Sequence, residues 1–142
     1  MDYRYKIEIP MDEEAVYIGN MLLEFNIESK SISQEKPFID INRCIKGENG
    51  EIIGGILACL ALWNVLSIDT LWVKKEFRNQ GIAKQLLSLV EADARIMGCN
   101  IVYLSTYDFQ AKDFYLKYGY EVYGILDECP KEHKLYHLSK RL

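Results

Sequence analysis

The sequence lacks any segment long and apolar enough to cross a membrane. Its longest apolar run, Ile52–Trp63, has 12 residues, whereas a membrane-spanning helix needs about 18 or more. The opening residues, MDYRYKIEIP, contain no apolar core of the kind that signal peptides carry. We therefore expect a cytoplasmic protein with no membrane partner.

Cysteine and histidine are scarce, and their spacing does not suit disulfide or metal chemistry. The four cysteines show no C-x-x-C spacing, and two of them stand inside apolar runs. Histidine occurs only at His133 and His137, and no third metal ligand accompanies the pair. The sequence predicts reduced thiols and no metal site. The cysteines are Cys44, Cys59, Cys99 and Cys129.

Excess positive charge and the common nucleotide-binding motifs are missing too. The formal net charge is -4 and the sequence pI is near 5.2, which argues against a nucleic-acid partner. Gly54-Gly55 lacks the Lys-Ser/Thr of a P-loop, and no G-x-G-x-x-G occurs. We expect neither ATP nor NAD as a ligand, and the acidic balance slightly favours a cationic substrate.

The chain does contain enough apolar material for a compact core. Hydrophobic residues make up 49% and charged residues 27% of its 142 residues. Single domains commonly have about 100 to 150 residues. We therefore expect residues 1–142 to form one domain.

The first half of the chain predicts one helix and several strands. Alternating residues predict a strand at Tyr3–Ile9, and Asp12 is expected to cap a helix that runs to about Asn26. The polar segment Ile27–Pro37 predicts a loop or a short irregular helix. Three antiparallel strands are predicted at Asp40–Lys46, Glu51–Trp63 and Val65–Val73, with a hairpin turn at the sequence GENG.

The second half begins with a change of period. Apolar residues at helical spacing predict a helix from Gln80 to Met97, ended by Gly98. The strand Ile101–Thr106 follows, and a strand–helix–strand crossover places its two strands in parallel. The remaining predicted elements are a short helix capped by Asp108 and stopped by Gly119, and the strands Glu121–Leu126 and Lys134–Ser139.

The stretch FRNQGIAKQLL, Phe77–Leu87, places an arginine and a glycine at the start of the long helix. A helix start has about four backbone N–H groups without partners and a partial positive charge. Gly81 would let a phosphate come close, and Arg78 and Lys84 would add charge. The pattern predicts a pyrophosphate site, although a turn glycine beside a solvated arginine explains the same local pattern equally well.

Several segments resemble the GNAT N-acetyltransferase superfamily. The sequence RNQGIA, residues 78–83, resembles its R/Q-x-x-G-x-G/A motif and follows a strand that ends L-W-V. The segments FQA, residues 109–111, and FYLKYGY, residues 114–120, resemble its A-x-x-F-Y-x-x-x-G-F/Y segment. CPKEHKLYHLSKRL resembles the final strand pair of small bacterial members. The likeness extends over about Ile52–Leu142 and covers the first fifty residues only in outline.

The resemblance implies a fold and a cosubstrate. The fold is mixed α/β (α+β), with a mostly antiparallel sheet of six to seven strands, a splayed parallel central pair at Val65–Val73 and Ile101–Thr106, and helices on both faces. Acetyl-CoA would bind in the opening between those two strands. Ala83 stands where many members have glycine, and Asp108 where asparagine is frequent. The cofactor-binding residues implied are Leu71, Trp72, Val73, Arg78, Asn79, Gln80, Gly81, Ile82, Ala83, Lys84, Asp108, Ala111 and Phe114.

Tyr115 matches the tyrosine that many family members use as a general acid. A phenol, with an ordinary pKa of about 10, can donate a proton to a departing thiolate. Tyr115 also stands on the apolar face of its helix, so a packing role is the alternative. Asp69 alternates in phase with Leu71 and Val73 and is the candidate general base, with a strand-edge carboxylate of no catalytic task as its alternative.

The sequence thus supports an acetyl-CoA-dependent N-acetyltransferase that acts on a primary amine by direct attack. The acceptor is a small molecule or a peptide, and a protein lysine or N-terminal amine is an alternative class. A non-catalytic CoA-binding sensor is the alternative from a different functional class. Strands at both ends of the chain leave sheet edges that a homodimer would cover.

Overall fold

The computed structural model describes residues 4–142, and the chain divides into two compact units, Met1–Ile32 and Ser33–Leu142. The first unit contains the helix α1 (Asp12–Ser29). Its first turn is acidic, and the Glu14 carboxylate accepts a 2.8 Å hydrogen bond from the Met11 amide. The N-cap is therefore Met11, one residue before the predicted cap Asp12. The helix ends at Ser29, three residues past the predicted end at Asn26.

The strand predicted at Tyr3–Ile9 does not form within the described residues. Residues 4–9 have no strand structure, and Tyr3 lies outside the described part of the chain. Alternation of polar and apolar residues indicates a strand only where a neighbouring strand accepts its backbone hydrogen bonds, and no described strand pairs with this segment. The prediction was wrong for this reason.

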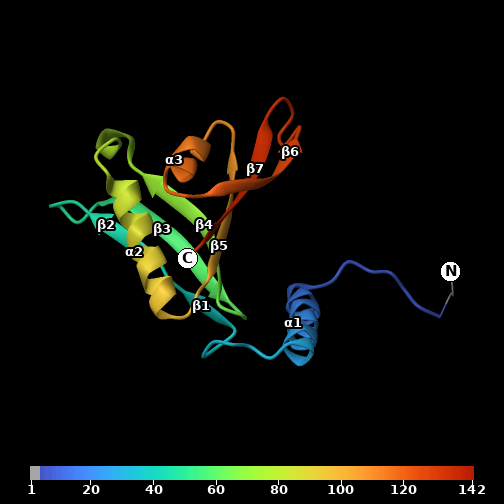
Figure 1. The fold of residues 1–142 in the computed structure, drawn as a ribbon. Coiled ribbons are helices and arrows are strands. Elements are labelled where there is room, and N and C mark those ends of the chain that lie inside the picture. The colour runs from blue at the N-terminus through green and yellow to red at the C-terminus, as the bar shows by residue number, and fades with distance from the viewer. Residues whose placement is uncertain (1–3) are drawn as a thin grey trace. The chain divides into compact units, whose positions relative to one another are not determined.

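The second unit is built on a mixed seven-stranded sheet (Figure 1). The strand order is β1-β3-β4-β5-β7-β6, and β2 also pairs with β3. All pairs are antiparallel except β4 with β5, as the sequence predicted. The strands are β1 (Phe38–Asp40), β2 (Arg43–Lys46), β3 (Ile52–Ala61), β4 (Val65–Val73), β5 (Ile101–Tyr107), β6 (Glu121–Asp127) and β7 (Lys134–Arg141).

The segment predicted as one strand at Asp40–Lys46 is broken in two. The Ile41 amide donates to the Ala58 carbonyl, at 2.8 Å, and the Ala58 amide donates to the Asn42 side-chain oxygen, at 3.0 Å. A side chain thus takes the place of a backbone carbonyl in the ladder, and the strand stops there. The GENG hairpin is confirmed: Gly50 has φ of 80° in the turn between β2 and β3.

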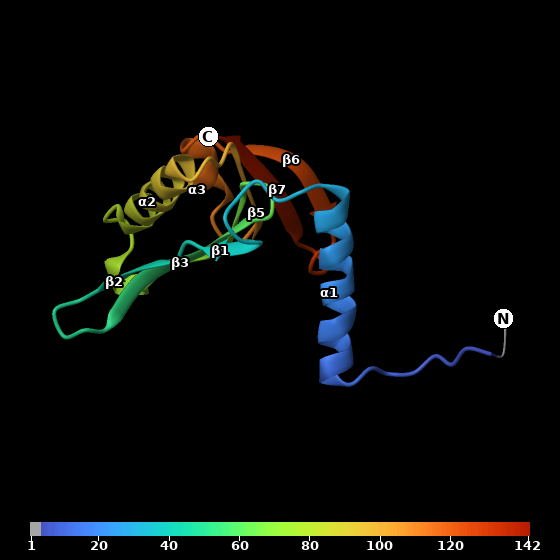
Figure 2. The same ribbon diagram turned by 90° about the horizontal axis from the view of Figure 1, so that it is seen from below.

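Helices α2 (Ile82–Ile96) and α3 (Lys112–Lys117) pack against the same face of the sheet (Figure 2). Helix α2 buries Leu86, Leu87, Val90 and Ala94, the stripe that the period predicted. Because α2 connects β4 to β5, the two strands run parallel, as expected. The core strand residues on this face are Ile56, Ala58, Leu60, Leu66, Ile68, Val102, Leu104 and Leu138.

A buried polar cluster joins α2 to the later strands. Glu91 on α2 is 5% exposed, and its Oε1 accepts a 2.8 Å hydrogen bond from the Tyr120 hydroxyl. The Lys140 ammonium of β7 lies 2.9 Å from Glu91 Oε2. A buried carboxylate is tolerated only when it is paired and hydrogen-bonded, and both conditions are met here.

Two predicted helix starts differ from those observed. Helix α2 begins at Ile82 instead of Gln80, because Asn79 (φ 62°) and Gly81 (φ 81°) are in the left-handed region and cannot continue a helix. Asp108 does not cap α3, whose N-cap is Ala111. The Asp108 carboxylate is instead bonded to the β6–β7 loop, as described below.

The described helices and thiols show little else that bears on function. No described helix is both long and apolar enough to cross a membrane. All four cysteines have free thiols. Burial raises the pKa of the Cys99 thiol, and its Sγ donates to the Ile101 carbonyl at 3.1 Å. Cys99 is therefore a packing residue.

Candidate active site

Strands β4 and β5 pair at one end and separate at the other. Their parallel register covers only Val65–Ser67 of β4, although β4 continues to Val73 and β5 to Tyr107. The separation follows a β-bulge, in which Leu57 of β3 pairs with Thr70 while Ala58 pairs with Ile68. The bulge bends the strand and opens the sheet. The splayed pair that the resemblance implied is confirmed.

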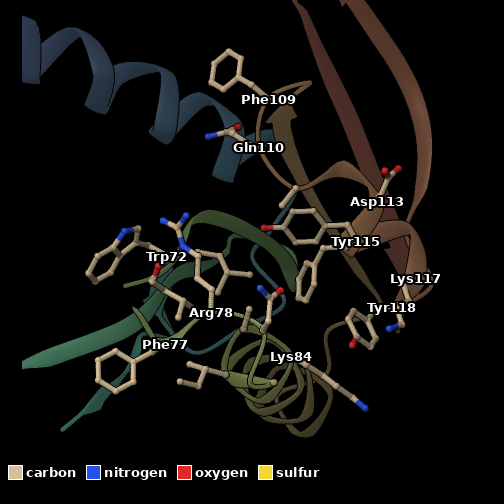
Figure 3. A pocket seen from close by; sticks show the side chains of 18 residues that line it. Trp72, Phe77, Arg78, Lys84, Phe109, Gln110, Asp113, Tyr115, Lys117 and Tyr118 are labelled. Carbon is tan, nitrogen blue, oxygen red and sulfur yellow. Dashed lines mark hydrogen bonds between the residues drawn. The ribbon is translucent and has the colours of Figure 1, made fainter. Parts of the chain in front are cut away.

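A cleft of about 880 Å³ occupies the region beside this opening. One wall comes from β4 and the β4–α2 junction, and the other from the β5–α3 turn and α3 (Figure 3). Every lining residue belongs to the second unit. The lining residues are Leu71, Trp72, Val73, Phe77, Arg78, Asn79, Gly81, Ile82, Ala83, Lys84, Phe109, Gln110, Ala111, Asp113, Phe114, Tyr115, Lys117 and Tyr118.

The start of α2 leaves its backbone donors open to this cleft. Among the residues that the structure describes, no acceptor bonds to the amides of residues 79–84. The helix has no capping side chain and no acidic residue in its first turn. Nothing lies within 4 Å of the position that a Cβ on Gly81 would take. Unpaired amides, a positive helix end and open space suit a bound anion with several oxygens.

Cationic side chains line the same cleft as the open amides. Arg78 Nε donates a 2.9 Å hydrogen bond to the Val73 carbonyl at the end of β4, which fixes the guanidinium at the cleft wall. The ammonium groups of Lys84 and Lys117 lie 5.5 and 5.9 Å from the centre of the Tyr118 ring. Asp113 is the acidic residue of the lining. The charge of this end of the cleft therefore favours an anion.

Tyr115 is a buried side chain whose hydroxyl has no protein partner. It is 6% exposed and packs edge-on against Phe114 and Tyr120. No described residue forms a hydrogen bond with its hydroxyl, which is turned toward the side of the cleft from which Arg78 and Trp72 project (Figure 3). Burial raises the pKa of Tyr115 to about 12. The phenol therefore remains protonated at neutral pH and is available as a donor.

Asp108 lies outside the cleft lining and is occupied within the protein. Its Oδ1 is 2.9 Å from His133 Nδ1, and its Oδ2 accepts a 3.0 Å hydrogen bond from the Lys134 amide. Partial desolvation acts to raise the pKa of Asp108, but the hydrogen bonds from His133 and Lys134 outweigh it and lower the pKa. The carboxylate ties the end of β5 to the β6–β7 loop.

Asp69 is the extra residue of the β4 bulge and does not line the cleft. The bulge interrupts the alternation on which its predicted position rested, so Asp69 does not lie in phase with Leu71 and Val73. Its Oδ1 accepts a 3.3 Å hydrogen bond from the Ser67 hydroxyl. Gln80 also lies outside the lining, whereas every other predicted cofactor-binding residue except Asp108 is part of it.

Six lining residues were not among the predicted site residues: Phe77, Phe109, Gln110, Asp113, Lys117 and Tyr118. Helical spacing could have found two of them, because Lys117 and Tyr118 follow Phe114 by three and four residues on α3. The positions of Phe109 and Gln110 depend on the turn after β5. Gln110 Oε1 accepts a 2.7 Å hydrogen bond from the Tyr107 amide, which holds this turn.

The described residues contain no group of three or more His, Cys, Asp or Glu side chains that could hold a metal ion. The two histidines have different partners. His133 is bonded to Asp108, and His137 Nδ1 lies 2.7 Å from the Ser105 hydroxyl.

Known proteins share both the sequence pattern and the fold. Blasticidin-S acetyltransferase from Streptomyces morookaense is 36% identical over 85 residues, which cover 59% of this chain and 62% of that protein. The matched part is thus less than two thirds of that relative. The crystal structure of an acetyltransferase from Bacillus cereus is 33% identical, covers 99% of this chain and 100% of its own, and superposes with a TM-score of 0.92.

A more distant structure shares the fold. The crystal structure of an aminoglycoside 6′-N-acetyltransferase complexed with coenzyme A covers 72% of each chain at 18% identity, with a TM-score of 0.63, and shares the fold. The sequence profile described as the acetyltransferase (GNAT) family matches residues 15–120. This chain therefore belongs to the acetyltransferase (GNAT) family, whose members are acyltransferase enzymes.

Proposed function

We propose that this protein transfers the acetyl group of acetyl-CoA to a primary amine of a small molecule. The observation that carries the proposal is the run of unpaired amides at residues 79–84, which faces the cleft beside the opening between β4 and β5. The amides, Arg78 and Lys84 would hold the pyrophosphate. β5 leaves the edge of β4 at Leu71–Val73 unpaired, and apart from the Val73 carbonyl, which accepts from Arg78 Nε, its backbone groups would offer hydrogen bonds to the pantetheine arm.

Tyr115 would serve as the general acid. When an amine attacks a thioester, a thiolate must leave, and a nearby phenol can donate a proton to it. The raised pKa of Tyr115, about 12, keeps the phenol protonated at the pH of the cell. Its hydroxyl is open to the cleft and has no competing partner among the described residues. Direct transfer from acetyl-CoA to the amine requires no covalent enzyme intermediate.

The proposed acceptor class rests on the relatives. One relative is named for blasticidin S and a structural neighbour for an aminoglycoside, and both names denote small molecules. Small-molecule amines are cationic at neutral pH, which agrees with the net charge of -4 of this chain. The first assay is thiol release from acetyl-CoA with a panel that contains blasticidin S, aminoglycosides, polyamines and a lysine peptide. Thiol release with the peptide alone would replace the small-molecule class by a protein acceptor.

Cofactor binding is tested by Gly81→Glu, with Gly50→Glu as a matched control. Both glycines have positive φ, 81° and 80°, and neither has an atom within 4 Å of a built Cβ. Each substitution therefore has a similar backbone cost of about 1–2 kcal/mol. Only the carboxylate at position 81 would occupy the proposed pyrophosphate site and repel the pyrophosphate of CoA.

We expect calorimetry to show loss of CoA binding, by at least 100-fold, for Gly81→Glu and near-normal binding for Gly50→Glu. Equal affinities in the two variants would contradict the pyrophosphate site. If wild-type protein binds CoA but no amine in the panel releases thiol, a non-catalytic CoA-binding role gains support.

A further inference from the structure

The loop between β6 and β7 presents a histidine that is oriented by a carboxylate. Oδ1 of Asp108, at the end of β5, lies 2.9 Å from Nδ1 of His133. The second carboxylate oxygen accepts from the Lys134 amide at 3.0 Å. The two residues are 25 positions apart in the chain. The pair therefore forms only because the sheet brings the two segments together.

The histidine ring is held from several directions. The His133 amide donates to the Pro130 carbonyl at 2.9 Å, and the His133 carbonyl accepts from the Cys129 amide at 3.1 Å. The Asp108 amide donates to the Lys134 carbonyl at 3.0 Å, which fastens the loop to β5. Phe109 lies edge-on to the ring, with centroids 5.1 Å apart. The backbone hydrogen bonds thus hold the loop, and the contacts with Asp108 and Phe109 orient the imidazole.

This arrangement selects one tautomer of the ring. A carboxylate only accepts hydrogen bonds, so Nδ1 must carry the proton and Nε2 keeps its lone pair in the neutral ring. No described residue forms a hydrogen bond with Nε2. The side chain is 45% exposed, so a ligand can reach this nitrogen. His137 differs, because its partner is the Ser105 hydroxyl, which can either donate or accept.

His133 contacts a residue of the cleft lining, although it is not itself one of the lining residues. Phe109, which contacts His133, is part of the cleft lining. Figure 3 shows Phe109 and Gln110 on the opposite side of Tyr115 from Lys84 and the start of α2. A ligand anchored at residues 79–84 and extended to Tyr115 therefore leaves the Phe109 side for the second substrate.

We propose that His133 is the general base of the reaction and that Asp108 is its positioning residue. This inference rests on the proposed acetyl transfer. The acceptor ammonium first loses one proton to solvent and reacts as the free amine. His133 Nε2 then takes a second proton from the acceptor nitrogen as the new C–N bond forms and the C–S bond of the thioester breaks. Tyr115 gives its proton to the departing sulfur. The two protein groups return to their first states by exchanging one proton with solvent, so atoms and charges balance.

Asp69, the base predicted from the sequence, is less suited to this step. Neither Asp69 nor His133 is one of the cleft-lining residues, but His133 contacts the lining residue Phe109, whereas Asp69 lies in the bulge and its Oδ1 accepts a hydrogen bond from the Ser67 hydroxyl. His133 has an orienting partner, Asp108, and an acceptor nitrogen with no partner among the described residues, which are two features of a general base.

The first test measures the tautomer by ¹⁵N NMR of the histidine side chains. In neutral wild-type protein we expect His133 to be protonated at Nδ1, and in Asp108→Asn we expect the preference to be lost. The His137 signals serve as the internal control and should not change. A wild-type His133 protonated at Nε2 would overturn the proposal, because that nitrogen could not accept a proton.

The second test uses thiol release from acetyl-CoA with butylamine as a minimal primary amine. His133→Ala should lower kcat at least tenfold without changing CoA affinity, and added imidazole should restore part of the rate. Asp108→Asn should lower kcat less, and His137→Ala should behave as wild type. A normal kcat in His133→Ala, or a loss that imidazole does not rescue, would overturn the role of His133.

The two proposals fail in distinguishable ways. If wild-type protein binds no CoA and releases no thiol with any amine, the proposed acetyl transfer fails and the base assignment fails with it. If wild-type protein is active and His133→Ala is equally active, only the base assignment fails.

Discussion

Tyr115 and Tyr120 have touching rings but differ in what their hydroxyls do. The rings lie edge-on with centroids 5.5 Å apart, and the side chains are 6% and 2% exposed. Burial raises the pKa of both phenols. The Tyr120 hydroxyl donates to Glu91 Oε1 at 2.8 Å, whereas no described residue bonds to the hydroxyl of Tyr115.

The difference separates a structural tyrosine from one that is available to a ligand. A buried polar group normally has a hydrogen-bond partner, so the Tyr120–Glu91–Lys140 cluster stabilises the fold. The Tyr115 hydroxyl reaches only the cleft, so its partner must be a ligand or water. Two residues of the same type and similar burial therefore differ in role: Tyr120 stabilises the fold, and the Tyr115 hydroxyl is the one that the proposed reaction would use.

The largest expected effect is the loss of the Glu91 carboxylate. Glu91→Ala would leave the Lys140 ammonium and the Tyr120 hydroxyl without their partner. Breaking a buried ion pair costs about 3 to 5 kcal/mol, and the lower end applies because the Lys140 side chain is 20% exposed. We expect urea unfolding to show a loss of about 3 kcal/mol. The exposed residue Glu76, replaced by Ala, is the control, and a loss equal to that of the control would contradict the role of the cluster.

Tyr120→Phe should have a smaller effect on the same quantity. The substitution removes a hydrogen bond to a charged group but keeps the ring packed, so we expect a loss of about 2 kcal/mol in the free energy of unfolding. Thiol release per folded molecule should not change, because Tyr120 does not line the cleft. A fall in turnover without a loss of stability would mean that Tyr120 acts in the reaction and does not stabilise the fold.

Tyr115→Phe should give the opposite pattern. No protein partner is lost, so the free energy of unfolding should stay within about 0.5 kcal/mol of wild type. Turnover should fall at least tenfold, or about 1.4 kcal/mol of barrier, while CoA affinity is retained. Unchanged turnover would make Tyr115 a packing residue like its neighbour.

The smallest expected effect concerns alkaline stability. The folded pKa of Tyr115, about 12, lies above the ordinary value of about 10 for an unfolded tyrosine. The folded chain therefore holds the proton more tightly, and this stabilisation is complete below about pH 10 and is lost as pH rises through about 12. Urea midpoints measured from pH 9 to 11.5 should fall less steeply for Tyr115→Phe than for wild type. Parallel curves would show that Tyr115 titrates with its ordinary pKa.

Elements with strong local patterns were predictable from the sequence. The strand Val65–Val73 has the bounds that were expected, and the apolar stripe of α2 was found by its helical period. The glycine at the start of α2, Gly81, could be recognised from the sequence because a positive φ at a helix start favours glycine. Such features depend on residues that are close together in the sequence, so local sequence patterns are enough to predict them.

Features that depend on distant segments were not predictable. Residues 4–9 alternate like a strand but have no described partner, so the pattern alone misleads. The bulge at Asp69 inserts one residue into β4 and changes the side-chain phase without any marker residue. The Asp108–His133 pair joins segments that meet only in the folded sheet. Each case requires knowledge of pairing that local periodicity does not contain.

The hydrogen bond from Arg78 Nε to the Val73 carbonyl has a consequence for residue choice. Fixing an arginine side chain costs about 2 kcal/mol of rotamer entropy. Because the hydrogen bond to Val73 already fixes Arg78 in the folded protein, much of this cost falls on folding and not on anion binding. A lysine at this position would keep the charge, but its single ammonium could not contact the strand and the anion together in the same way. If the proposed pyrophosphate site is correct, Arg78→Lys would therefore weaken CoA binding even though the net charge of the protein stays the same.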